Sequence, residues 1–122
     1  MTDFPDSLAR IFAMSNDWPI PEDLSANGRK AAETIRDFFT EKNITNHGGG
    51  GKFYSPQQWL DRGELYGLGS LLIITHDGGD HAGAFNLDYE QYELHDQLQT
   101  RLRSLGVFVE GCTGWYSAIH PI

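Results

Sequence analysis

Two histidines and two aspartates follow the most apolar stretch of the chain. Residues 71–74 read Leu-Leu-Ile-Ile, the pattern of a buried strand, and His76, Asp77, Asp80 and His81 come directly after it. Imidazole and carboxylate groups bind zinc, manganese and iron, and a rigid strand can hold such groups in place. We therefore consider a divalent transition metal held by His76, Asp80 and His81. In that interpretation Asp77 is the general base, or orients a ligand, in a small hydrolytic enzyme.

The same stretch has the composition of an ordinary turn. Asp77 to Asp80 reads Asp-Gly-Gly-Asp, and these residue types are favoured in turns because they tolerate the backbone angles that turns require. The spacing also matches no established metal motif, since the chain has no His-Glu-x-x-His, no Cys-x-x-Cys and no calcium loop. The metal-dependent enzyme is therefore the alternative hypothesis, and the favoured one requires no cofactor.

Acidic and aromatic side chains gather in the second half of the chain. From Asp77 to Asp96 there are six acidic residues and no Lys or Arg, and such a stretch can attract a cation or a basic partner. Tyr and Trp add a large contact area that carries a polar group, as is typical of protein interfaces. The expected binding surface consists of Asp88, Tyr89, Glu90, Tyr92, Glu93, Trp115 and Tyr116.

The favoured hypothesis is thus a small acidic protein that binds other molecules and is not an enzyme. We expect a protein partner of basic charge, and we expect the surplus of aromatic side chains to support a homodimer. An inhibitor that presents carboxylates in place of nucleic-acid phosphates is a special case. The competing interpretation of the charge is a solvated face that only keeps the protein in solution.

Composition argues against other classes of function. The formal net charge of −8 argues against direct binding to nucleic acid and against an anionic membrane surface. The apolar run at residues 71–74 is far shorter than the roughly 20 residues of a membrane span, and the acidic start of the chain predicts no signal peptide. Cys112 is the only cysteine, so we expect no disulfide within the chain. Together these features predict a cytoplasmic protein.

Four consecutive glycines, Gly48 to Gly51, precede a lysine and match a phosphate-binding loop only in part. A Walker A motif requires glycine at position 46 and Ser or Thr at position 53, where this chain has Asn46 and Phe53. A flexible connection between a helical and a sheet-containing part is the favoured interpretation, and binding of a small anion is the alternative. We expect Cys112 to be a packing residue rather than a nucleophile.

Hydrophobic periodicity and turn residues predict the elements that must position these groups. Apolar residues at three- and four-residue spacing indicate two long helices, while short runs of β-branched and aromatic residues indicate strands. We expect helices at about 6–14, 22–42, 56–62 and 88–105, and strands at about 52–55, 69–76, 107–110 and 115–119. The first long helix becomes regular only after Ser25, because Asn-Gly in its first turns weakens it.

This order of elements predicts one globular domain over residues 1–122. Its helical part covers about residues 6–43 and its sheet-containing part covers about residues 52–120. We expect an α+β fold, namely a two-layer sandwich in which two longer helices cover one face of a small, mostly antiparallel sheet of about three to four strands.

Overall fold

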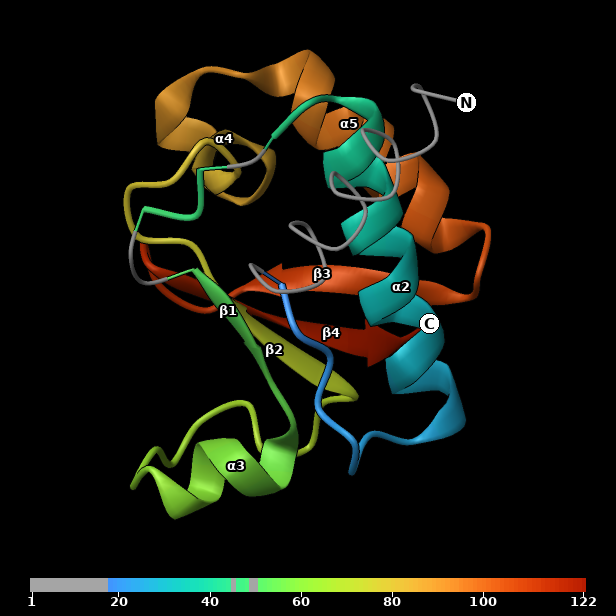
Figure 1. Ribbon diagram of the computed structural model, residues 1–122, viewed down its shortest axis with the longest axis vertical. Coiled ribbons are helices and arrows are strands. Elements are labelled where there is room, and N and C mark those ends of the chain that lie inside the picture. The colour runs from blue at the N-terminus through green and yellow to red at the C-terminus, as the bar shows by residue number, and fades with distance from the viewer. Residues whose placement is uncertain (1–17, 45, 49–50) are drawn as a thin grey trace, which may run out of the picture.

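The computed structural model describes residues 18–44, 46–48 and 51–122, so the helix expected at 6–14 lies outside the described residues. The elements are α2 (Ala26–Glu41), β1 (Lys52–Tyr54), α3 (Pro56–Asp61), β2 (Leu72–Thr75), α4 (Ala82–Phe85), the 3-10 helix η1 (Leu87–Tyr89), α5 (Tyr92–Arg103), β3 (Val107–Gly111) and β4 (Tyr116–Pro121). Figure 1 shows α3 at the opposite end of the molecule from α4 and α5. A small sheet lies between these groups of helices.

The last strand of the chain lies in the middle of the sheet. The strand order is β1-β2-β4-β3, and every neighbouring pair is antiparallel. The register pairs Ile73 with Ala118 and Val109 with Ile119. Because β2 and β3 are both antiparallel to β4, they run parallel to each other, and the chain passes from β2 to β3 through α4 and α5.

Helix α2 begins where the sequence supplies a cap. The Gly28 backbone N–H donates a hydrogen bond of 3.1 Å to Ser25 Oγ, which satisfies one of the N–H groups that the first turn leaves unpaired. The helix therefore starts after Ser25, as predicted, and it ends at Glu41. Its buried side chains recur at the spacing of one helix face, and they are Ala31, Ala32, Ile35, Phe38 and Phe39.

Gly28 lies where α2 approaches the backbone that leads into β2. A Cβ atom at this position would be 2.5 Å from the Leu71 carbonyl oxygen, and only a backbone shift can relieve such a contact. We expect Gly28→Ala to lower the free energy of unfolding by roughly 1–3 kcal/mol, although the same change in an open helix position is stabilising by about 1 kcal/mol. Urea unfolding measures the change, with the exposed neighbour Asn27→Ala as the control. A more stable Gly28→Ala protein would contradict the close packing.

The main hydrophobic core lies between one face of the sheet and the two long helices. The sheet contributes side chains that alternate along each strand, and the helices contribute one apolar stripe each. Its fully buried members include Phe38, Phe39, Phe53, Leu72, Ile74, Leu98, Leu102 and Ile119. The predicted α+β sandwich, with an antiparallel sheet and two longer helices, is confirmed.

The other face of the sheet carries a smaller cluster under α3. The predicted helix start is confirmed, because Ser55 and Gln58 form a reciprocal capping box around the first turn. Trp59 on α3 is fully buried and packs with Ile73, Tyr116 and Ala118, and its indole N–H donates to the Tyr66 carbonyl oxygen at 2.9 Å. Helical cover on this second face was not part of the sequence prediction.

The helix expected at residues 88–105 begins later than predicted. Asn86 Oδ1 accepts a hydrogen bond from the Asp88 N–H at 3.0 Å, which closes the short 3-10 turn η1 instead of an α-helical turn. Glu90 then adopts a left-handed conformation with φ of 59°, which interrupts a right-handed helix. The α-helix proper runs only from Tyr92 to Arg103. The short helix α4 was not predicted.

Candidate functional site

The histidine that follows β2 lies inside the protein. His76 is 1 % exposed, its Nε2 is 2.9 Å from the hydroxyl oxygen of Ser117, and its ring stacks on Phe85 with centroids 5.2 Å apart and planes 8° apart. Burial and, after it, the nearby imidazole of His81 lower the pKa of His76 to about 4. At neutral pH the ring is therefore uncharged and held by an internal hydrogen bond.

His81 occupies a second interior position. It is fully buried, its Nε2–H donates to the Thr75 carbonyl oxygen at 3.0 Å, and the Trp18 ring meets it edge-on at a centroid distance of 4.6 Å. Burial lowers the pKa of His81, while the hydrogen bond to Thr75 opposes this shift. Gly51 and Gly79 allow the backbone to come this close, because a Cβ on either would lie 2.5 Å from Cε1 of the His81 ring.

The structure places the three proposed metal ligands in different surroundings. Asp80 is exposed, as is the proposed base Asp77, whereas His76 and His81 are buried and use their Nε2 atoms in internal hydrogen bonds. Within residues 18–44, 46–48 and 51–122, no group of three or more His, Cys, Asp or Glu side chains is arranged to hold a metal ion. The arrangement of these side chains therefore gives the hypothesis of a metal-dependent enzyme no support.

The sequence carries a signal for the burial of His76 that the metal hypothesis overlooked. Side chains alternate between the two faces of a strand, so His76 belongs to the same face as Leu72 and Ile74, which are core residues. His81 had no comparable signal. It immediately precedes α4, and its place in the core depends on the turn at residues 77–80 and on contacts with distant residues such as Trp18.

Five of the seven residues of the expected binding surface follow one another along η1 and the start of α5. We call this group the acidic surface, and it consists of Asp88, Tyr89, Glu90, Tyr92 and Glu93. All five are exposed, and the two tyrosines expose 47 % and 55 % of their surface. The left-handed Glu90 separates η1 from α5, so the surface is a turn followed by a helix start and not one continuous helix face.

The remaining two residues of that prediction belong to a different part of the molecule. Tyr116 is 5 % exposed and Trp115 is partly buried, and both contact Trp59, with ring centroids 5.0 and 5.9 Å away. The guanidinium group of Arg62 lies over the same aromatic cluster, 4.9 Å from the centre of the Trp59 ring. These two aromatic side chains therefore serve the packing of the second face of the sheet.

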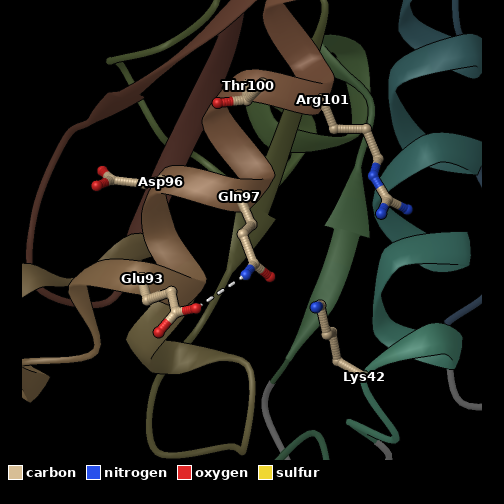
Figure 2. Close-up of a pocket in the computed structure, with 6 residues that line it drawn as sticks. All are labelled: Lys42, Glu93, Asp96, Gln97, Thr100 and Arg101. Carbon is tan, nitrogen blue, oxygen red and sulfur yellow. Dashed lines mark hydrogen bonds between the residues drawn. The ribbon is translucent and has the colours of Figure 1, made fainter.

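The acidic surface borders a groove between the end of α2 and α5. Two adjoining cavities, of about 670 and 500 Å³, share three lining residues, Lys42, Glu93 and Gln97. Figure 2 shows the hydrogen bond that Gln97 donates to Glu93, with Lys42 and Arg101 on the side of the groove that faces α2. Arg101 forms an ion pair with Glu41, and this hydrogen bond lowers the pKa of the Glu41 carboxyl group.

The charged residues around this groove are unevenly distributed along the sequence. From Gly63 to Thr100 the sequence has no Lys or Arg, and this segment includes the acidic surface and most of α5. The basic groups that line the groove come from outside the segment, and they are Lys42 and the ion-paired Arg101. A positively charged group approaching η1 therefore meets carboxylates first.

The glycine tract and the cysteine have structural contacts. The Gly51 N–H donates to the His47 carbonyl oxygen at 2.8 Å, and the Gly48 N–H donates to Asn46 Oδ1 at 2.9 Å. Cys112 is partly buried beside Glu110, and burial followed by that carboxylate raises the pKa of its thiol. A protonated thiol is a poor nucleophile, in agreement with the expected packing role.

No family model, no curated protein and no solved structure matches this chain. Among the described residues, no helix combines the length and the apolar character needed to cross a bilayer.

Proposed function

We propose that this protein is a binding protein that receives a basic segment of another protein on its acidic surface. The observation that carries the proposal is a run of three exposed carboxylates and two exposed tyrosines, of which Glu90, Tyr92 and Glu93 line the groove beside α5. The other candidate functional side chains, His76 and His81, are buried and form hydrogen bonds inside the protein.

Lys and Arg side chains fit this surface for two reasons. Their charged ends can pair with Asp88, Glu90 or Glu93, and their cations can lie over the faces of Tyr89 and Tyr92. Each exposed ion pair contributes only about 0.2–1 kcal/mol, so a useful affinity requires several contacts at once. We therefore expect an extended partner segment with several basic residues, and binding that weakens as salt concentration rises.

Reversing two charges on the acidic surface tests the proposal. We expect Glu90→Lys/Glu93→Lys to weaken binding of a fluorescently labelled deca-arginine peptide about tenfold, because two attractions become repulsions. Fluorescence anisotropy titrations at several salt concentrations measure the affinity. The matched control is Glu22→Lys/Glu33→Lys, which makes the same change in net charge at two exposed positions away from the surface and should weaken binding no more than about twofold.

Two results would count against the acidic surface. Equal weakening by both double variants would show that the peptide responds only to net charge. Unchanged affinity in Glu90→Lys/Glu93→Lys would show that the peptide binds elsewhere.

A further inference from the structure

The two outer strands of the sheet differ in how they are protected. Beside β1, the segment Pro19-Ile20-Pro21 lines a cavity together with Lys52 and Phe53. Proline has no N–H to offer, and lysine is disfavoured in an intermolecular strand pair, so this edge is poorly suited to pairing. β3, at the other edge, is five residues long and contains neither proline nor lysine.

The register shows which backbone groups of β3 point outward. The residues that flank β3 both form hydrogen bonds on the side of β4. The Ile122 N–H donates to the Gly106 carbonyl oxygen, and the Cys112 N–H donates to the Tyr116 carbonyl oxygen. Hydrogen-bonded positions alternate in an antiparallel pair, so the N–H and C=O groups of Val107, Val109 and Gly111 face away from β4. Within the described part of the chain, no strand pairs with this edge.

A groove runs beside this free edge. It has a volume of about 540 Å³, and Val109 and Gly111 line it on the strand side. On the helix side it is lined by one face of α5, namely His95, Asp96, Gln99, Thr100 and Arg103, with Phe85 completing the wall. Asp96 and Thr100 also line the cavity between α2 and α5, and Figure 2 shows that their side chains point away from Lys42 and Arg101.

The charges on this face of α5 are arranged so that the face complements a copy of itself. Asp96 and Arg103 are two helical turns apart, which corresponds to about 10 Å along the axis. Only residues 104–106 connect α5 to β3, so the two elements run in opposite directions, with Arg103 toward the Val107 end of β3 and Asp96 toward the Gly111 end. The distance from Val107 to Gly111 is about 13 Å in a strand, close to the separation of the two charges.

We propose that two copies of this chain associate through antiparallel pairing of their β3 edges, with the twofold axis at Val109. In this register Val109 pairs with the partner's Val109, and Val107 pairs with the partner's Gly111, so all outward-facing backbone groups find partners. The same axis places Arg103 opposite the partner's Asp96. The two four-stranded sheets become one continuous sheet. This interface uses none of the acidic surface, so it is independent of the proposed function.

A proline at Val109 tests the pairing. Because the Val109 N–H points outward, Val109→Pro removes two intermolecular hydrogen bonds per dimer and leaves the pairing with β4 intact. Sedimentation equilibrium should give the mass of two 13.7 kDa chains for the unmodified protein and for the control Val109→Ala, and the mass of one chain for Val109→Pro. Circular dichroism checks that each variant is folded. A monomeric unmodified protein at 100 µM, or a folded Val109→Pro dimer, would overturn the proposal.

A charge exchange tests the register without altering the strand. Asp96→Arg and Arg103→Asp should each raise the dimer dissociation constant about tenfold, because each places two like-charged pairs across the axis. The double variant Asp96→Arg/Arg103→Asp should return to within about threefold of the unmodified value. A double variant as weak as the single ones would overturn the antiparallel register. Glu90 and Glu93 are unchanged in these variants. Failure of the dimer proposal would therefore not affect the interpretation of the peptide-binding experiment.

Discussion

Acidification from pH 7 to pH 4 should lower the free energy of unfolding by about 3 kcal/mol through His76 alone. In the unfolded chain this side chain titrates near its ordinary value of 6.5, whereas in the folded protein its pKa is about 4. Between these two values the unfolded chain binds more protons than the folded protein. The contribution of His76 to the free energy of unfolding is therefore fully present above pH 6.5 and falls as the pH drops toward 4. Below pH 4 this contribution changes little further.

The neighbours of His76 act in both directions. The imidazole of His81 lowers its pKa further and the carboxylate of Asp77 raises it, but burial is the largest effect. The pKa of His81 is also lowered, chiefly by burial, with a further lowering by His47 and a raising by Asp80. His81 therefore adds to the acid sensitivity in the same direction.

Urea unfolding at pH 7, 6, 5 and 4, followed by tryptophan fluorescence, measures this dependence. The matched variant is His76→Gln, whose amide can still hydrogen bond to Ser117 but does not titrate in this range. Groups other than residue 76 titrate in both proteins, so the difference between the two profiles isolates His76. We expect that difference to shrink by about 3 kcal/mol between pH 7 and pH 4. Parallel profiles would show that the buried ring does not resist protonation.

Trp59→Ala should lower the free energy of unfolding by about 3–5 kcal/mol. Trp59 is fully buried under α3, where its ring lies 5.0 Å from the centres of both Tyr54 and Tyr116. Removing it empties the centre of the second cluster and leaves the Tyr66 carbonyl oxygen without the indole donor. The loss of stability should exceed the contribution of any single contact in this cluster, because the other aromatic rings pack against Trp59.

Two further variants distinguish packing from a general effect of mutation in α3. Trp59→Phe keeps a ring but loses volume and the indole N–H, so we expect a loss of roughly 1–3 kcal/mol. Leu60→Ala changes a side chain that is 46 % exposed and should cost less than about 1 kcal/mol. Urea unfolding followed by circular dichroism compares all three. Similar losses for Trp59→Ala and Leu60→Ala would contradict a separate second core.

The sequence predicted helix starts well where a local capping signal marked them. Ser25 fixed the start of α2, and Ser55 with Pro56 fixed the start of α3, because capping depends on neighbouring residues only. The predicted start of α5 was wrong, since nothing in its own composition forbids a helix through Glu90. The left-handed backbone of that residue follows the 3-10 turn that Asn86 caps, and the side chain of Gln91 then packs against Gly83.

The site was predictable only in part for a related reason. Charge and aromatic content along residues 88–93 are properties of a continuous segment, and the segment is exposed as expected. Trp115 and Tyr116 were predicted to lie on the same surface because they are residue types that interfaces favour. Their packing on Trp59 depends on contacts between distant parts of the chain, to which composition gives no access.

The central place of β4 has a consequence for how the chain folds. β2 and β3 do not pair with each other, and each pairs instead with β4, residues 116–121. This strand follows all the other strands in the chain. Before they leave the ribosome only β1 and β2 can pair, and a two-stranded sheet is marginal in water. The main core also has no Ile119 until then. Folding is therefore a late, cooperative event governed by contacts between distant residues, which is the slow regime for a small domain.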